Sequence, residues 1–467
     1  MNVYNTLGRV MQPLEPRTPG EVSMYVCGPT VQAAPHVGHG RQAVAFDVIR
    51  RYLVWRGYAV LFVTNITDVE DKIINAAAEE GITAEEVARR ATAQFLDAYG
   101  RLRVQPADEL VYATHEIPAM IATIARLIER GHAYPAGGDV YFSVRSLRGY
   151  GKLSGRNVDE MRSGARIDPG EHKQDPLDFA LWKASKPGEP AWDSPWGSGR
   201  PGWHIECSAM AVERLGFGFD IHGGGLDLIF PHHENEIAQA EGAEGDEPFA
   251  RYWLHNGMLN LRGEKMSKSE GNIVDLLGLL DRYRPEAVRL YYLRAHYRQP
   301  LEFGDDLLAD AEASLDRLWA FRRRIGTVGD APDAGVVAAF QAAMDEDFNT
   351  AGAMAVLFDA VREGNRLADS GEDATPIAAA YDEIVAVLAI GEDAVDVTDL
   401  AGDLGALGAE LGVDATEPRA IVDALVALRS AAREGRDFAT SDRIRDELTE
   451  LGIVLEDGAD GTTWHRR

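Results

Sequence analysis

The chain has 467 residues, 45% of them hydrophobic, which is enough for two to four domains with buried cores. The formal charge of −28 excludes a protein that binds polyanions through a uniformly basic surface, but it leaves room for a local arginine patch. No apolar run is long enough to span a membrane and no signal pattern opens the chain, so we expect a cytoplasmic protein with no membrane partner. In that reducing compartment Cys27 and Cys207 are buried thiols or metal ligands rather than a disulfide.

The stretch from residue 22 to residue 53 predicts a strand followed by a helix. Residues 22–26 suit a buried strand that ends at Cys27, and a Gly-Pro pair then breaks the chain. A helix is predicted from near Gly38 to Leu53, because its apolar residues recur at helical spacing. A strand-to-helix junction of this kind presents backbone N–H groups and a helix N-terminus to a phosphate. We therefore expect a phosphate site beside Cys27.

Strand and helix signals alternate through the first half of the chain. Residues 59–63 predict a second buried strand that ends in polar residues, and residues 85–99 predict a helix. This order predicts an α/β fold, a doubly wound parallel sheet with its ligand crevice at the carboxyl ends of the strands. Residues 107–200, with many Gly- and Pro-containing loops, are interpreted as an insertion into that sheet. The sheet pattern is predicted to resume over residues 202–211, 219–222 and 252–259.

After residue 304 the composition becomes helical and rich in alanine. Thr350 and Thr416 are predicted to cap helices, and the residues around 457–461 predict a final hairpin. We expect a helical bundle followed by a small α+β domain. The predicted divisions are a first catalytic half 1–106, the insertion 107–200, a second catalytic half 201–255, a loop region 256–304, the bundle 305–400 and the C-terminal domain 401–467.

Four potential zinc ligands lie far apart in the sequence. Zinc takes four ligands from cysteine, histidine and carboxylate side chains in a tetrahedron. Cys27 and Cys207 each lie near a predicted strand end, and His232 and Glu236 share one face of a predicted helix. Spacing alone leaves a second interpretation open, in which the cysteines are core residues and the histidines begin a polar helix. The alternative ligands from the same run are His233 and Glu234.

Two segments carry groups suited to phosphate chemistry. His36 and His39 lie at the predicted helix start, where ring and backbone N–H groups can donate to a phosphate. Residues 265–269, Lys-Met-Ser-Lys-Ser, hold two of the chain's seven lysines. A mobile clamp on a polyphosphate needs such cations where charge develops. The alternatives are a pair of structural histidines and a solvated charged loop.

Together these segments resemble the class I aminoacyl-tRNA synthetases. His36-Val-Gly-His39 is similar to their HIGH motif, with Val37 in place of isoleucine, and residues 265–269 are an intact KMSKS motif. Nearly the whole chain resembles the cysteinyl-tRNA synthetase family, which implies a Rossmann-type parallel sheet. The segments that carry this closer resemblance are residues 25–31, 64–73, 202–210, 219–225, 230–239 and 453–464.

The resemblance implies roles for individual residues. It implies one zinc ion per chain with four protein ligands, Cys27, Cys207, His232 and Glu236. It implies a set of residues that contact the phosphates of ATP or the departing pyrophosphate, namely His36, Gly38, His39, Lys265 and Lys268. It also implies a set that lines the amino-acid pocket, namely Thr67, Trp203 and Asp227. ATP would bring Mg²⁺ with it.

The implied activity is the ATP-dependent attachment of L-cysteine to its tRNA through a cysteinyl-adenylate, by a monomeric enzyme. Zinc is soft enough to bind a thiolate, and metal ligation deprotonates a thiol far more readily than the hydroxyl of serine. Such a site discriminates strongly, so no editing domain is expected. In the family the C-terminal domain reaches the anticodon. The local arginines there, which suit phosphate contact or a solvated helix face, are Arg429, Arg433, Arg436, Arg443 and Arg445.

Two other functions share these motifs. A cysteine:amino-sugar ligase of the mycothiol type has the catalytic domain and the zinc, but it lacks the C-terminal module that residues 401–467 supply here. A noncatalytic zinc- or nucleotide-binding regulator would not need intact HIGH- and KMSKS-type motifs. Cysteine-dependent ATP–pyrophosphate exchange, followed by tRNA charging, distinguishes the three.

Overall fold

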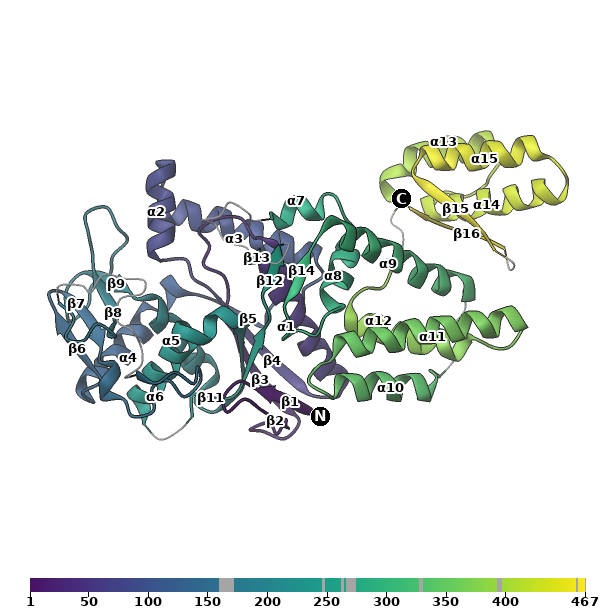
Figure 1. The fold of residues 1–467 in the computed structure, drawn as a ribbon. Coiled ribbons are helices and arrows are strands. Elements are labelled where there is room, and N and C mark those ends of the chain that lie inside the picture. Colours follow the sequence, from purple (N-terminus) through teal and green to yellow (C-terminus); the bar gives the residue numbers. More distant parts are fainter. Residues whose placement is uncertain are drawn as a thin grey trace. The chain divides into compact units, whose positions relative to one another are not determined.

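The computed structural model describes residues 1–158, 172–245, 248–261, 264–265, 274–326, 331–392, 397–458 and 461–466 (Figure 1). The chain forms two compact units, the first with residues 1–313, 338–356 and 387–389 and the second with residues 314–337, 357–386 and 390–467. Within the described ranges, no helix combines the length and the apolar composition that crossing a membrane requires.

The first unit is built on a five-stranded parallel sheet with strand order β11-β10-β3-β4-β5. The strands are β3 (Glu21–Val26), β4 (Ala59–Ile66), β5 (Glu109–Tyr112), β10 (Phe219–Gly225) and β11 (Ala250–Asn256). The chain runs outward from β3 to β5 and then returns to the other side of β3, so the winding reverses between β3 and β10. Ligands of such sheets bind at the carboxyl ends of the strands that flank this reversal. The predicted α/β fold with a doubly wound parallel sheet is confirmed.

Helix α1 (Val37–Trp55) follows β3, close to the predicted helix. It packs tightly on β10, because a Cβ atom on Gly223 would lie only 2.3 Å from the ring of Phe46. Only glycine permits this approach. Near its start, Gln42 donates a hydrogen bond of 2.8 Å to the carbonyl of Cys27. The first turns of α1 therefore lie beside the end of β3.

Seven more α-helices lie between residues 71 and 293 in the described part of the chain. They are α2 (Asp71–Glu80), α3 (Ala84–Arg101), α4 (Ile117–Glu129), α5 (Trp203–Leu215), α6 (Glu234–Glu244), α7 (Leu276–Leu280) and α8 (Pro285–Leu293). The predicted helix 85–99 corresponds to α3, whereas α2 was not predicted. A large apolar cluster joins the sheet to α4, α5 and α6 through residues such as Val63, Ile124 and Trp253.

The insertion is a four-stranded antiparallel sheet with order β6-β7-β8-β9. Its strands are β6 (Ala133–Ala136), β7 (Asp139–Phe142), β8 (Phe179–Ala184) and β9 (Gly199–Pro201). The prediction began the insertion at residue 107, which is too early, because β5 at residues 109–112 belongs to the parallel sheet. β5 has four residues and only Val111 is buried, so it carries little of the apolar pattern that marks a strand.

Residues 202–211 do not continue the sheet as predicted. They form the first turns of α5, which begins at Trp203 and contains Cys207. Most of α5 is buried, including polar residues such as Glu206 and Ser208, so its sequence lacks the polar face from which helical periodicity is read. Cys207 therefore lies on a helix and not at a strand end.

The remaining elements are short strands and long helices. A hairpin joins β1 (Asn2–Asn5) and β2 (Val10–Pro13), and a separate sheet contains β12 (Leu259–Leu261), β13 (Glu264–Lys265) and β14 (Leu301–Phe303). Four helices follow, α9 (Asp305–Ile325), α10 (Ala334–Met344), α11 (Thr350–Ser370) and α12 (Thr375–Leu388). The cap of α11 lies one residue before the predicted Thr350, because the side chain of Asn349 accepts the N–H of Gly352 at 2.9 Å.

The last part of the second unit is a small α+β domain. It contains α13 (Ala401–Glu410), α14 (Pro418–Glu434), α15 (Phe438–Glu450) and the hairpin β15 (Ile453–Gly458) to β16 (Gly461–Arg466). Its own apolar cluster includes Leu404, Leu425 and Ile444. The predicted final hairpin is confirmed. The residue before α14 is Glu417, one position after the predicted cap Thr416.

Candidate active site and metal centre

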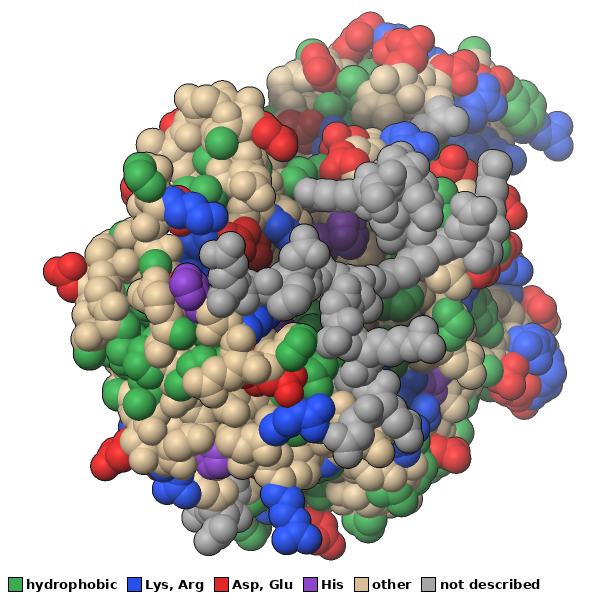
Figure 2. Space-filling view, turned by 60° about the vertical axis from the view of Figure 1, so that its left-hand side comes forward, with side chains coloured by type: hydrophobic (Ala, Val, Ile, Leu, Met, Phe, Trp, Pro, Cys, Tyr) green, Lys and Arg blue, Asp and Glu red, His purple; other side chains and the backbone are tan. Residues whose placement is uncertain are grey.

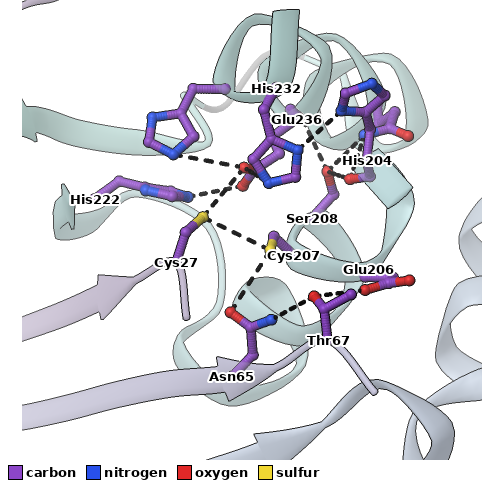
Figure 3. Close-up of polar contacts among 12 residues, drawn as sticks. Cys27, Asn65, Thr67, His204, Glu206, Cys207, Ser208, His222, His232 and Glu236 are labelled. Carbon is purple, nitrogen blue, oxygen red and sulfur yellow. Dashed lines mark hydrogen bonds and ion pairs between the residues drawn. The ribbon is translucent and has the colours of Figure 1, made fainter. Parts of the chain in front are cut away.

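Four of the predicted site residues meet where the winding of the sheet reverses (Figure 3). Cys27 follows β3, and its backbone N–H donates to the carbonyl of Gly223 in β10 at 3.0 Å. His232 lies in the turn before α6, Glu236 lies in the first turn of α6, and Cys207 faces them from α5. Segments that are far apart in the sequence thus bring two thiols, an imidazole and a carboxylate together at the carboxyl ends of β3 and β10.

The donor atoms of these four side chains lie within 4.8 Å of one another. The two Sγ atoms are 3.6 Å apart, and Oε1 of Glu236 is 3.4 Å from Sγ of Cys27 and 3.0 Å from Nε2 of His232. A tetrahedral zinc site with ordinary bond lengths has donor separations of about 3.8 Å between two sulfurs and about 3.4–3.5 Å for the pairs with oxygen. The separation of the two sulfurs and that of Cys27 from Glu236 fit a zinc ion of this kind, whereas Glu236 and His232 are about 0.4 Å closer than in such a site, at a hydrogen-bond distance.

The electrostatics of the cluster also suit a cation. Burial, followed by the hydrogen bond with Cys207 and the negative groups around it, raises the pKa of the Cys27 thiol well above its ordinary value. Burial, followed by the neighbouring His204 and His222, lowers the pKa of His232 well below its ordinary value, so this imidazole is neutral and able to ligate. A bound divalent cation would favour the thiolate form, which is the form that ligates metals.

His204 and His222 orient the potential metal ligands His232 and Glu236. Nδ1 of His232 lies 2.9 Å from Nδ1 of His204, which leaves Nε2 toward Glu236. Oε2 of Glu236 lies 2.8 Å from Nε2 of His222, while Oε1 faces Cys27 and His232. Metal-binding histidines and carboxylates in proteins typically have such second partners.

The structure contains a second possible ligand set, which includes the predicted alternative ligand His233 together with His222, a residue that the sequence did not suggest. Cys27 and Glu236 also lie within 4.8 Å of His222 and His233. The set with Cys207 suits zinc better, because it offers two soft thiolates where the other offers one. His222 could have been suspected, since it stands in strand β10 directly before three glycines.

The three residues predicted to line the amino-acid pocket differ in their burial and contacts. Thr67 is buried, and its hydroxyl donates to Oε2 of Glu206 at 2.9 Å. Trp203 begins α5, and its ring stacks on that of His232 with 4.2 Å between centroids. Asp227 is exposed in the turn after β10, and among the contacts of the described residues it has no hydrogen bond to Thr67 or Trp203. Sequence reasoning missed Glu206, which has no motif of its own.

His36 and His39 form a capping box at the N-terminus of α1. The His36 ring accepts the N–H of Gly38 at 3.1 Å, and the His39 ring accepts the N–H of His36 at 3.1 Å. Their rings stack with 3.7 Å between centroids. Both rings are thus fixed through Nδ1 at a helix N-terminus, where the helix dipole attracts anions.

The second predicted phosphate segment is only partly described. Lys265 is in β13, opposite Asn260 of β12, and its side chain lies outside the described part of the chain. Lys268 lies outside the described residues altogether. The segment that follows the motif returns to α1, since the N–H of Val37 donates to the carbonyl of Val274 at 3.1 Å. Val274, the first described residue after this motif, therefore lies beside the HIGH-type motif.

The predicted arginine cluster of the C-terminal domain is mostly paired with acids. Arg429 is buried and binds both carboxylate oxygens of Asp457, at 2.7 and 2.9 Å, so it stabilises the domain rather than facing a phosphate. Arg433 shares Asp457, and Arg443 binds Glu410. Basic and acidic side chains are likewise interspersed on the face of the protein in Figure 2.

Three family models match successive parts of the chain. Residues 13–313 match the class I (C) catalytic domain of tRNA synthetases, residues 339–390 match the DALR domain, and residues 417–464 match the cysteinyl-tRNA ligase anticodon binding domain. Two solved structures are similar in fold. The methionyl-tRNA synthetase of Mycobacterium tuberculosis bound by methionyl-adenylate has a TM-score of 0.59 at 17% identity, over 79% of this chain and 90% of that one. A putative arginyl-tRNA synthetase from Campylobacter jejuni has a TM-score of 0.52 at 13% identity, over 79% and 90%.

The parallel sheet, the site at its winding reversal and these matches define a class I aminoacyl-tRNA synthetase. The cysteine–tRNA ligase of Alkalilimnicola ehrlichii is 50% identical over 471 residues, covering 100% of both chains. That of Pseudomonas paraeruginosa is 49% identical over 475 residues, covering 99% of both. The chain belongs to the cysteine–tRNA ligase family.

Proposed function

We propose that this protein uses ATP to attach L-cysteine to its cognate tRNA. The observation that carries the proposal is the identity of 49–50% with cysteine–tRNA ligases over their full length. The buried cluster of Cys27, Cys207, His232 and Glu236 supports it, because these side chains could hold a zinc ion at the winding reversal, and zinc binds thiolates.

The first step joins cysteine to AMP. The carboxylate of cysteine attacks the α-phosphorus of ATP, which arrives with Mg²⁺, and the bond to the β-phosphate breaks to release pyrophosphate. We propose that His36, Gly38 and His39 at the N-terminus of α1 bind the phosphates, since that end of the helix attracts negative charge. Lys265 and Lys268 are proposed to stabilise the leaving pyrophosphate.

In the second step the ribose 2′-hydroxyl of the terminal tRNA adenosine attacks the carbonyl of the cysteinyl-adenylate, and AMP leaves. Here the chain's contribution is to hold both groups in position and to keep water away from the mixed anhydride. Thr67, Trp203 and Asp227 are proposed to orient the amino acid. Thr67 and Trp203 are supported by their closeness to the cluster, and Asp227 is supported by the sequence resemblance alone.

We propose one zinc ion per chain, held by Cys27, Cys207, His232 and Glu236. When bound, zinc would supply a soft acceptor for the thiolate of the substrate, which serine cannot offer. The protein groups then have two duties. They present two thiolates, an imidazole and a carboxylate at fixed separations, and they exclude water, since all four are buried.

The other parts of the chain are proposed to serve the tRNA. Residues 401–467 are proposed to recognise the anticodon, residues 305–400 to form the connecting bundle, and residues 256–304 to contact the acceptor stem. A cytoplasmic monomer completes the proposal. The match of residues 417–464 to an anticodon binding domain supports the first of these roles, and it disfavours a ligase that hands cysteine to an amino-sugar.

ATP–pyrophosphate exchange on the purified protein tests the proposal. We expect exchange with cysteine, none with serine at the same concentration, one zinc per chain, and cysteine attached to tRNA when the cognate tRNA is added. Exchange without charging of tRNA would instead identify a cysteine ligase with another acceptor. Bound zinc without exchange would contradict the proposed activity.

A further inference from the structure

The side chain of Asn65 connects three parts of the site (Figure 3). Asn65 is the second-last residue of β4 and is fully buried. Its Oδ1 accepts the backbone N–H of Gly28 at 2.9 Å and lies 3.7 Å from Sγ of Cys207. Its Nδ2 donates to the hydroxyl of Thr67 at 3.2 Å. One amide thus touches the residue after Cys27, the thiol of Cys207 and the hydroxyl of Thr67.

The hydrogen bonds continue from Thr67 to α5. The Thr67 hydroxyl donates its one proton to Oε2 of Glu206 at 2.9 Å and accepts from Asn65. A hydroxyl has one donor and two acceptor sites, so a single acceptor site of Thr67 remains. With Asn65 as its donor and Oε2 of Glu206 as its acceptor, Thr67 meets a further ligand as an acceptor and not as a donor.

The energetic cost of this arrangement is high for a purely structural feature. Asn65 and Glu206 are both fully buried, and Oε1 of Glu206 has no hydrogen-bond partner among the described residues. Buried polar groups that are only half satisfied reduce stability, and they cluster where a protein uses them. Each side-chain contact of Asn65 is also made to a residue of this site or next to it, and not to a distant part of the fold.

We propose that Asn65, Thr67 and Glu206 form a positioning chain that couples the cysteine ligands of the metal to the pocket for the amino acid. The inference rests on the proposed function and deepens it. Asn65 accepts the N–H of Gly28 and so holds the backbone next to Cys27, while its Oδ1 lies 3.7 Å from Sγ of Cys207, a packing contact and no longer a hydrogen bond once that thiol is deprotonated. Through Thr67 it turns a hydroxyl acceptor toward the substrate's ammonium group, which can only donate hydrogen bonds.

Asparagine is the side chain that meets these demands. Aspartate has the same shape and keeps an acceptor for Gly28, but it has no donor for Thr67. Leucine has a similar size and offers neither group. The two substitutions at Asn65 therefore separate the link to the metal ligands from the link to the substrate.

The test compares Asn65→Leu, Asn65→Asp and Glu206→Gln with the control Thr123→Val in the full-length protein. Thr123 is buried on α4, belongs to no part of the proposed site and donates to the carbonyl of Ala119 at 2.9 Å. The readouts are KM and kcat for cysteine in ATP–pyrophosphate exchange, and zinc affinity in competition with the chelator 4-(2-pyridylazo)resorcinol. Melting temperatures report folding.

We expect Asn65→Leu to raise KM for cysteine about tenfold and to weaken zinc binding about tenfold. Asn65→Asp should raise KM by a similar factor without weakening zinc binding, because Gly28 stays bonded and the added negative charge attracts the cation. Glu206→Gln should also raise KM while zinc affinity stays unchanged, and the double variant Asn65→Asp/Glu206→Gln should lose less than the product of the single losses. In all of these kcat should change less than KM, and Thr123→Val should match the wild type.

A merely structural role would lower melting temperatures without separating KM from kcat, and that result would overturn the inference. Unchanged KM and zinc affinity in folded Asn65→Leu would overturn it as well; if Asn65→Leu does not fold, unchanged KM in Asn65→Asp decides against it. If the wild-type protein shows no exchange at all, the proposed function fails. The zinc affinity of Asn65→Leu then still decides whether Asn65 positions the metal ligands.

Discussion

Gly28 follows β3 and lies directly against Asn65 of β4, and replacing it with alanine should disrupt both the metal centre and the reaction. A Cβ atom added to Gly28 would lie 1.6 Å from the backbone oxygen of Asn65 and 2.7 Å from its carbonyl carbon. Both obstacles are backbone atoms, so no side chain can rotate to relieve the clash. The chain after Cys27 must therefore move away from β4.

The size of that movement follows from the contact distance. Real Cβ atoms essentially never come closer than 3.0 Å to another heavy atom, so the two segments must separate by roughly 1.4 Å. A displacement of about 1 Å in an enzyme site can cost a factor of about 100 in rate. The same movement breaks the 2.9 Å hydrogen bond between Gly28 and Asn65 and shifts Cys27. We expect Gly28→Ala to lose at least about 100-fold in cysteine-dependent exchange and about tenfold in zinc affinity.

Gly100→Ala is the matched control. Gly100 lies near the end of α3, and a Cβ atom there would meet nothing within 4 Å. Alanine is the better helix former by about 1 kcal/mol, so this variant should keep full activity and melt at the same or a slightly higher temperature. Exchange activity within about threefold of the wild type in Gly28→Ala, with zinc retained, would refute the steric reasoning.

Three further predictions concern the ligands, the support of α1 and the C-terminal domain. Cys207→Ser should weaken zinc binding by more than about 100-fold, because loss of a residue that only hydrogen-bonds a metal ligand already costs about 10–100-fold. Zinc analysis and serine-dependent exchange measure this effect. Full zinc retention would contradict the assignment of Cys207 as a ligand. Arg289→Met should lower the free energy of unfolding by about 3 kcal/mol, because Arg289 is fully buried and its guanidinium binds Asp47 and two backbone carbonyls. Urea titrations measure this free energy, and a loss below about 1 kcal/mol would contradict the prediction. The hydrogen bond from Arg429 holds the pKa of Asp457 well below its usual range, so the stability it contributes is present above pH of about 4 and is lost as the pH falls further. Calorimetry from pH 6 to pH 3 should show this loss in the wild type and not in Asp457→Asn.

The elements that the sequence predicted well are those with a local signal. The strand before Cys27 is apolar from Val22 to Val26 except for Ser23, and the strand from Ala59 begins with a continuous apolar run. Helix α1 begins at a motif that caps it through its own histidines. These patterns depend on neighbours in the chain, so they can be read without the fold. The resemblance to the synthetases likewise rested on contiguous segments, and the family matches confirm it.

The elements that were missed depend on distant contacts. Residues 202–211 were expected to continue the sheet, yet they form α5, because nearly every side of that helix is covered by the rest of the domain. Residues 109–112 were assigned to the insertion, although they pair with β4 as the edge strand of the parallel sheet. In both cases tertiary burial or strand pairing, and not the local pattern, determines the structure.

For the site, the sequence by itself determined which residue types are available, namely two cysteines, the histidines near α6 and the HIGH- and KMSKS-type motifs. Only the tertiary structure decided which of them meet, because the donors come from β3, α5 and α6, and their separations depend on how those elements pack. The same packing gave Asn65 and Glu206, which carry no motif, their contacts with the cluster. It also paired Arg429 with Asp457, so that a residue with the charge for a phosphate contact serves the core of its own domain.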